Sequence, residues 1–357
     1  MEIINVENDN SARNRMILRR CNYFELLNDR QFQSRFRLTK LQFEEILQKI
    51  EPILRQRQRK DEIAPVIQLL VAIRFYATGC FLQVAADFCG ISSKSAQLIV
   101  HRISPAIADL FNQYISLPKT DEELMRTTKD NFLIAGMIRV IGAIDCVHVR
   151  IRSYGGEDAE LWRNRKGFFS LNVQCVVNSH LEIMDLVVRW PGSTHDSTIF
   201  ANSRLKHRFD HFECGNGILL GDRGYANHRY LITPLANPTT PAEILYNEAH
   251  IRTRNMVERC FGIWGRTFAV LTIGSRFTTP ERTINVIFAT AVLYNIIRRD
   301  KKTARAGMQN YLQIPEVFSP PTEDERQFLI NNYFEREKST YSTPEQQIAP
   351  NGGGFSG

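Results

Sequence analysis

Three aspartates lie inside or directly after apolar segments, where an ionised carboxylate needs a partner. Asp145 lies within residues 140–149, Asp222 directly follows residues 217–221, and Asp196 follows the letters WPGSTH. A buried charge of this kind is costly unless it is paired, hydrogen-bonded or bound to metal. Converging carboxylates also repel one another, and a divalent cation removes both difficulties. Ligands that are all oxygen favour Mg²⁺ or Mn²⁺ over zinc.

Each of these acids also has a structural alternative. Asp145 can pair with an arginine, Asp196 can cap the helix that follows it, and Asp222 can cap a turn. A fourth acid, Glu258, lies among apolar positions of a predicted helix, where an i,i+4 pair with Arg254 is the alternative. Taken singly, no acid decides between the two interpretations. Their order and spacing together favour a metal site.

The segments that carry these acids have the pattern of strands and helices. Four short runs rich in Val, Ile and Leu, separated by Gly, Asn-Ser or His-Asp, predict strands over residues 140–151, 170–178, 181–190 and 217–220. Helices are expected over residues 197–209 and 242–268. Three consecutive strands, a helix, a strand and further helices is the order of an RNase H-like core, a mixed sheet with flanking helices in the α/β class.

The region before this core is helical and basic. Within it, five residues have helix-turn-helix spacing: a small residue where helices cross, a glycine at the turn, a capping serine and apolar anchors. They are Ala86, Gly90, Ile91, Ser92 and Ile99. An ordinary helical hairpin in an all-helical domain is the alternative. The sequence therefore predicts an all-helical N-terminal domain that is helix-turn-helix-like.

A helix beginning at Ser92 or Ser93 would have one polar, weakly basic face. Ser93, Lys94, Gln97 and His101 share that face, and Ala96, Ile99 and Ile103 share the buried one. If the helix enters a major groove, Gln97 would contact bases and Lys94 a phosphate. One lysine and one neutral histidine supply little charge for unaided DNA binding.

Length and composition fit a large globular protein with a polyanionic partner. The chain has 357 residues, 43% of them hydrophobic, with a formal net charge of +7 and an isoelectric point near 9.1. We expect five segments: an N-terminal arm (1–27), a helical helix-turn-helix-like domain (28–117), a connection (118–135), an RNase H-like nuclease domain (136–303) and a polar, partly disordered tail (304–357).

Other sequence features favour a soluble intracellular protein. The seven cysteines are scattered and never form C-x-x-C, so they predict reduced thiols and no disulfide frame or zinc ribbon. The first ten residues lack the apolar core of a secretory signal. The longest apolar run, residues 284–297, is too short to span a bilayer comfortably.

The motifs around the acids resemble a known family. The chain is similar, from about residue 36 to residue 295, to the Harbinger-type (PIF/Harbinger) DDE transposases and their domesticated relatives, the Harbinger transposase-derived nucleases. The motifs that carry this resemblance are GAIDCVH (142–148), NRKG (164–167), WPGSTHD (190–196), GDRGY (221–225), TPAE (240–243) with YN (246–247), and VERCFG (257–262).

The resemblance implies roles for the acids. The family's catalytic acids fall on Asp145, Asp222 and Glu258, and its further motif aspartate, also a proposed metal ligand, falls on Asp196. Two Mg²⁺ or Mn²⁺ ions held by the four carboxylates would activate a water or a DNA 3′-hydroxyl and hold the leaving oxygen. The implied activity is that of a metal-dependent DNA endonuclease of transposase origin. A domesticated protein that binds DNA or a partner protein without cutting is the alternative.

The basic and histidine residues of these motifs have less defined roles. The family's Arg-Lys-Gly segment falls on Arg165 and Lys166, and Lys166 is either a phosphate contact or a solvated lysine at a turn. His148 and His195 flank two of the acids but form neither H-E-x-x-H nor a Cys/His zinc signature, so we interpret them as structural or as orienting a ligand.

The resemblance also implies a partner and a compartment. Transposition systems of this family use a separate Myb-like protein for DNA binding and nuclear import, so we expect this chain in the nucleus with such a partner and partly in the cytoplasm without it. The chain's own basic cluster, residues 298–302, is too short and interrupted to be a strong import signal. Homo-oligomerisation is left open, and DNA is the expected substrate.

Overall fold

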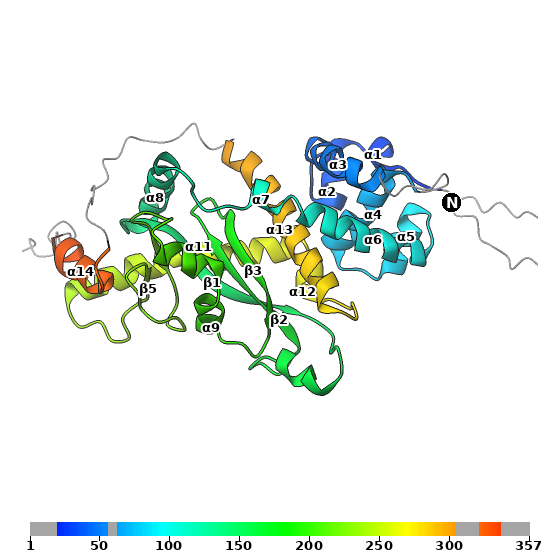
Figure 1. The fold of residues 1–357 in the computed structure, drawn as a ribbon. Helices are drawn as coiled ribbons and strands as arrows, with labels where there is room; N and C mark the ends of the chain where they lie inside the picture. Colours follow the sequence, from blue (N-terminus) through cyan, green and yellow to red (C-terminus); the bar gives the residue numbers. More distant parts are fainter. Residues whose placement is uncertain (1–19, 56–62, 304–320, 337–357) are drawn as a thin grey trace, which may run out of the picture.

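The computed structural model describes residues 20–55, 63–303 and 321–336 of the chain. Figure 1 shows a group of helices near the N-terminus at one end of the molecule and a twisted sheet surrounded by helices at the other, with helix α13 lying between the two. Among the described helices, none is long and apolar enough to cross a membrane. All seven cysteines lie in described residues, and none forms a disulfide.

The N-terminal part is all helical, as its sequence pattern predicts. Its helices are α1 (Tyr23–Leu26), α2 (Asp29–Phe36), α3 (Lys40–Arg55), α4 (Pro65–Thr78), α5 (Leu82–Cys89), α6 (Ser93–Ala108) and α7 (Phe111–Tyr114). Helix α4 is buried on nearly all sides, because its sequence is apolar around its whole circumference. Helix α6 packs against α4 and α13, which joins this part to the rest of the chain.

Helices α5 and α6 and their turn lie where the sequence analysis placed them. Gly90 ends α5 with a φ of 69°, a left-handed conformation that favours glycine, and the Ser92 side chain caps α6 by accepting from the Ser95 amide. Ala96 is buried as expected. His101 does not belong to an exposed face, because its ring is half-buried and packs edge-on against Phe277 at 5.4 Å.

A five-stranded mixed sheet forms the centre of the second part. Its strands are β1 (Val140–Arg150), β2 (Ser170–Val177), β3 (Ile183–Pro191), β4 (Ile218–Leu220) and β5 (Leu231–Ile232). Their order is β3-β2-β1-β4-β5; β1 to β3 are antiparallel, β4 is parallel to β1, and β5 is parallel to β4. The predicted mixed sheet with flanking helices is confirmed. Strand β5 was not predicted, since two residues give no periodic signal.

Helices cover both faces of the sheet. They are α8 (Asp121–Ala135), α9 (Asp196–Ala201), α10 (Arg204–Asp210), α11 (Pro241–Thr267), α12 (Val270–Ile273) and α13 (Pro280–Thr303), while the 3₁₀ turn η1 (Glu157–Trp162) belongs to the connection between β1 and β2. One face packs mainly against α11 and α13 in the larger hydrophobic core. On the other face, Ile144 and Leu219 belong to a smaller cluster with Phe200 of α9 and Tyr225.

The structure differs from the sequence expectations in three elements. The expected connection, residues 118–135, contains helix α8, which Thr120 caps and which packs on β1 and α11. The expected helix over residues 197–209 is two helices, because Ser203 starts α10 by accepting from the Lys206 amide. The expected tail contains α14 (Glu325–Leu329) and the π-helical turn η3 (Ile330–Phe334), whose apolar side chains are buried. Residues 1–19 of the arm and residues 304–320 and 337–357 of the tail lie outside the described residues.

Candidate active site

Asp145 is partly buried and lies in the middle of β1. Its Oδ2 accepts a hydrogen bond from Arg254 Nη1 at 3.0 Å, and its Oδ1 accepts from the Cys146 amide at 2.8 Å. The pKa of Asp145 is raised to about 6, mainly by burial and also by the negative charges of Asp222 and Asp196, while its two donors oppose the rise. In the folded protein, the charged form of Asp145 is therefore disfavoured despite an arginine partner.

Glu258 lies one turn after Arg254 on α11 and shares that arginine with Asp145. Its Oε1 accepts from Arg254 Nη2 at 2.6 Å, and its side chain is 53% exposed, against 17% for Asp145. The structural alternatives for these two acids, an arginine pair for Asp145 and an i,i+4 pair for Glu258, are thus both present. Sequence spacing alone did not show that one guanidinium serves both.

Asp222 stands beside Asp145 because β4 is parallel to β1. The register pairs Ala143 with Leu220, and each aspartate lies two residues further along its own chain. Neighbouring strands are about 4.8 Å apart, so this register brings the two carboxylates to one level of the sheet. Asp222 Oδ1 accepts from the Gly224 amide at 2.9 Å, which is the turn cap that the sequence suggested as the alternative.

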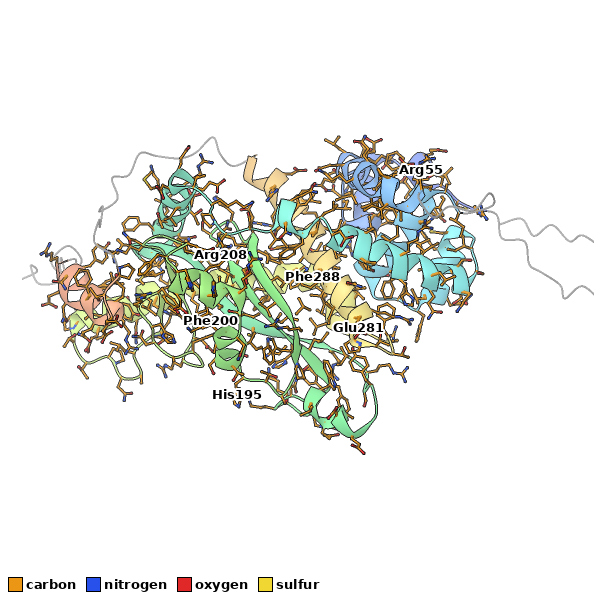
Figure 2. All side chains as sticks on the ribbon, viewed as in Figure 1. Arg55, His195, Phe200, Arg208, Glu281 and Phe288 are labelled. Atoms are coloured by element: carbon orange, nitrogen blue, oxygen red, sulfur yellow. The ribbon has the colours of Figure 1, made fainter. Side chains whose placement is uncertain are left out.

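Asp196 approaches the same place from α9. It is the first residue of that helix, and the N-cap position belongs to His195, so the cap alternative for Asp196 is wrong. Instead, Asp196 Oδ1 accepts from Asn172 Nδ2 at 2.9 Å. Its negative charge raises the pKa values of Asp145 and of Cys146, in each case after the effect of burial. Figure 2 shows His195 at the outer end of α9 and Phe200 further in, towards the sheet.

The donor chemistry of this site fits a hard divalent cation. All four acids offer only oxygen ligands. The negative charges of Asp222 and Asp196 help to raise the pKa of Asp145. Within residues 20–55, 63–303 and 321–336, no three His, Cys, Asp or Glu side chains already stand together as a metal cage. Arg254 supplies one positive charge, which Asp145 and Glu258 share.

The flanking histidines are held by neighbours. His148 Nδ1 lies 3.0 Å from Ser170 Oγ, and burial lowers the pKa of His148 although Asp196 opposes this. His195 Nδ1 lies 3.0 Å from Arg165 Nη2. Lys166 is exposed. These contacts agree with a structural or orienting role for both histidines, and Arg165 and Lys166 remain at the surface beside the acids.

Two residues of this site had no assigned role in the sequence analysis. Asn172 orients Asp196 and also donates to the Thr194 carbonyl at 2.9 Å. A buried amide in an apolar strand is a usable signal, since buried polar groups need partners. Tyr225 approaches Cys146, with Tyr225 Oη 3.4 Å from Cys146 Sγ, and belongs to the smaller apolar cluster with Phe200 of α9. In the sequence, Tyr225 could have been identified by its position as the last residue of the GDRGY motif.

Comparisons with known proteins agree with this geometry. Residues 144–295 match the family described as DDE superfamily endonuclease. The chain is 36% identical over 245 residues to "Putative nuclease HARBI1" of Rattus norvegicus, covering 68% of this chain and 70% of the relative. It is 30% identical over 291 residues to the protein of that name in Xenopus laevis, covering 78% and 83%. "Protein ALP1-like" of Arabidopsis thaliana is 23% identical over 246 residues, covering 64% and 60%. No solved structure matches the chain.

Proposed function

This chain belongs to the family of Harbinger transposase-derived nucleases, and from that premise we propose that it is a divalent-metal-dependent endonuclease that hydrolyses DNA phosphodiester bonds. The observation that carries the proposal is the excess of acid around Asp145. That carboxylate is raised to a pKa of about 6 by burial and by two further aspartates, although an arginine and an amide donate to it. Strongly perturbed groups of this kind concentrate at functional sites.

In this proposal, Asp145, Asp222 and Glu258 are the catalytic acids, and together with Asp196 they are the metal ligands. Two bound Mg²⁺ or Mn²⁺ ions would supply the positive charge that activates the attacking water and stabilises the leaving oxygen. The strands and helices fix the carboxylates: β1 and β4 hold two, α9 holds the third, and α11 holds the fourth. Asn172 and the Gly224 amide orient Asp196 and Asp222.

Arg254 has a place in the same proposal. Its single positive charge is shared by Asp145 and Glu258, with donor distances of 3.0 and 2.6 Å. Since a cation and a guanidinium compete for the same oxygens, a bound metal would displace Arg254 from the two carboxylates. The guanidinium donors of Arg254 would then be available to bind a phosphate oxygen.

We extend the proposal to the fold and the DNA contacts. The strand order and directions of the sheet support an RNase H-like core, and the α5–α6 pair with its glycine turn supports a helix-turn-helix-like element. Lys94 is exposed on α6 and Gln97 is half-buried, so Lys94 is the stronger DNA contact of the two. Arg165 and Lys166 would contact the backbone nearer the acids. A nuclear location with a Myb-like partner, and assembly as a homo-oligomer, also stand as proposals.

The deciding experiment is a nicking assay. Purified wild type should nick supercoiled plasmid DNA with Mg²⁺ or Mn²⁺ and not with EDTA. Asp145→Asn, Asp222→Asn and Glu258→Gln should each lower the rate about a thousandfold or more, since each removes a charged ligand worth several kcal/mol. The matched control is Glu248→Gln, an exposed glutamate on the same helix, which should keep the wild-type rate. Unchanged nicking in all three variants would refute the assignment of the site.

One observation favours a second candidate, a protein that binds DNA or a partner without cutting. Each acid already has a protein donor in the structure, so the cluster can persist as a structural element. This candidate predicts that wild type binds DNA but never nicks it with either metal. It also predicts that the three variants bind DNA as well as wild type does.

A further inference from the structure

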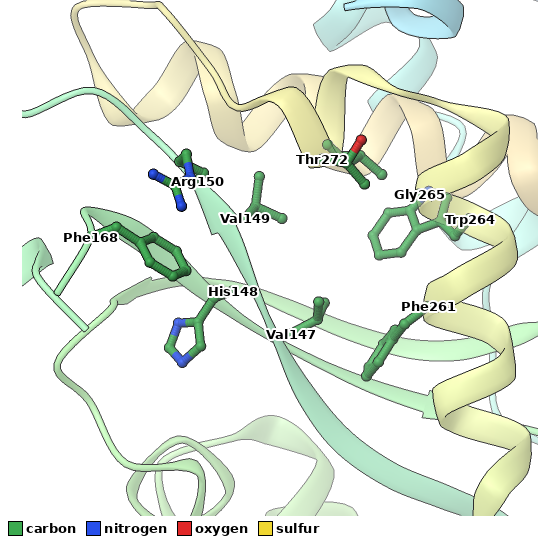
Figure 3. Close-up of a pocket in the computed structure, with 10 residues that line it drawn as sticks. Val147, His148, Val149, Arg150, Phe168, Phe261, Trp264, Gly265 and Thr272 are labelled. Carbon is green, nitrogen blue, oxygen red and sulfur yellow. The ribbon is translucent and has the colours of Figure 1, made fainter. Parts of the chain in front are cut away.

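A groove lies beside the acids, between the second half of β1 and the C-terminal half of α11. It encloses about 290 Å³, and its walls include Val147, His148, Arg150, Phe168, Phe261 and Trp264. Figure 3 shows Phe168 and His148 on one side of the groove, Phe261 and Trp264 on the other, and Val147 and Val149 between them on the strand. The groove thus has an aliphatic floor with aromatic walls.

The groove begins where the acid site ends. Val147 lies two residues after Asp145, which is about 7 Å along a strand, and Phe261 lies three residues after Glu258, which is about 4.5 Å along a helix. The same two elements therefore deliver acids to the candidate active site and groove walls next to it. A molecule whose phosphate lies at the acids extends its neighbouring groups into the groove.

The rim of the groove carries positive charge over an aromatic face. The Arg150 guanidinium lies 4.2 Å from the centre of the Phe168 ring, and Arg150 is exposed. An arginine over a ring keeps guanidinium donors for a phosphate. Phe168 and Phe261 are both only half-buried, so their rings are partly open to a ligand.

We propose that this groove stacks one nucleobase of unpaired DNA next to the phosphodiester bond at the acids, with Arg150 contacting the backbone. The inference rests on the proposed nuclease function and specifies how its substrate is held. A volume of about 290 Å³ is at the lower limit of ligand pockets and too small for a duplex. Flat aromatic walls with a cationic rim match a base attached to an anionic chain, because every base presents a π face whatever its sequence. The enzyme would therefore prefer a site where one base is out of the stack.

The test compares two oligonucleotides that differ only in their bases. Full-length protein in EDTA is titrated with a labelled single-stranded thymidine oligonucleotide and with an abasic oligonucleotide of the same length and phosphate number. Wild type should bind the thymidine strand about five- to a hundredfold more tightly, the usual range for base stacking on aromatic residues. Phe168→Leu and Phe261→Leu should bring that ratio close to one, because leucine keeps volume but offers no ring.

Two further variants separate stacking from charge and from surface effects. Arg150→Gln should weaken binding of both strands equally and reduce their salt dependence. The control is Phe212→Leu, which removes an exposed ring under Arg229, 4.5 Å from its centre, and should keep the wild-type ratio. A wild-type ratio of one, or a ratio unchanged in both Phe168→Leu and Phe261→Leu, would overturn the proposal.

The outcome is independent of the nicking assay. Base-dependent binding without nicking would support the groove and contradict the nuclease, whereas nicking with equal binding of both strands would support the nuclease and overturn the groove. Asp145→Asn adds a check, since it should abolish nicking and keep the base-to-abasic ratio. If a phenylalanine variant fails to fold, the fluorescence of Trp264 in a protein that carries Trp162→Phe and Trp190→Phe still reports the groove, and it should change with the thymidine strand and not with the abasic one.

Discussion

Two ion pairs, one just before β1 and one within it, differ in how well their charges are matched. Just before β1, Arg139 Nη1 donates to Glu325 Oε1 of α14 at 2.7 Å, and both side chains are almost fully buried, at 6% and 0% exposed. Six residues later, Asp145 pairs with Arg254 at 3.0 Å, with 17% and 16% of these side chains exposed. The first pair joins Arg139 to Glu325, whereas in the second Arg254 is shared by two carboxylates, Asp145 and Glu258.

This difference separates a structural pair from a functional one. At Arg139, the paired charges stabilise each other against the burial that lowers the pKa of Arg139 and raises the pKa of Glu325, and the Thr322 amide donates to the other Glu325 oxygen at 2.8 Å. At Asp145 the charges do not cancel, and burial leaves the surplus uncompensated. A protein tolerates such a surplus where a cation or a substrate will compensate it. The four predictions below test this contrast, in order of decreasing expected effect.

Removing the charge of Glu325 should cost the most stability. Glu325→Gln leaves the buried Arg139 without its carboxylate, and breaking a buried pair in this way costs about 3–5 kcal/mol. Urea unfolding at pH 7 measures the loss. Glu323→Gln, an exposed neighbour, should change the free energy of unfolding by less than about 0.5 kcal/mol. Equal losses in the two variants would contradict a structural role for the buried pair.

Asp145 should make the metal-free protein less stable as pH rises. Its folded pKa of about 6 is above the ordinary value of 3.8, so between these values the folded state holds its proton more tightly than the unfolded state. Stability from this group is therefore greatest below pH 4 and is lost as pH rises to about 6, by about 3 kcal/mol.

Burial also raises the pKa of Asp185 to about 6, so Asp185 changes the stability over the same pH range. The effect of Asp145 is therefore isolated by comparing wild type with Asp145→Asn. We expect the decline in the free energy of unfolding between pH 4 and pH 7, in EDTA, to be about 3 kcal/mol smaller in that variant than in wild type. Parallel pH profiles for the two proteins would show that the Asp145 charge is already compensated.

Replacing Arg254 should tighten metal binding. Arg254→Gln removes the positive charge that competes for Asp145 and Glu258, and we expect the Kd for Mn²⁺ to fall about tenfold, or about 1.4 kcal/mol. Calorimetric titration measures this. Arg259→Gln, an exposed arginine on the same helix, is the control and should bind as wild type does. Weaker binding in Arg254→Gln would mean that the arginine organises the ligands and does not compete with metal.

Asp196→Asn should have the smallest effect. Because Asp196 is not the N-cap of α9, the variant should lose less than about 1 kcal/mol of stability, mainly through the helix dipole. Asn172 can still donate to an amide oxygen there. Mn²⁺ affinity should fall about threefold, since one charged ligand of four becomes neutral. Wild-type Mn²⁺ affinity in this variant would remove Asp196 from the ligand set.

Local sequence patterns predicted most elements of the fold. The runs over 140–151, 170–178 and 181–190 became β1, β2 and β3 with shifts of at most two residues, because buried strands need continuous apolar β-branched stretches. The helix expected over residues 242–268 is α11 (Pro241–Thr267), and a Thr240–Glu243 capping box starts it. Elements whose stability comes from packing were missed, among them the polar helix α8, the two-residue β5 and the docked α14.

For the candidate site, the sequence alone determined which residue types are available and their order along the chain. It also determined the local i,i+4 pair of Arg254 with Glu258, since a helix fixes that distance. Only the tertiary structure decided that Arg254 also reaches Asp145, 109 residues away in the chain, and that Asp196 begins α9 without capping it. The physical reason is that sheet register, helix docking and burial are set by the whole core, and these determine which charges meet and how strongly they interact.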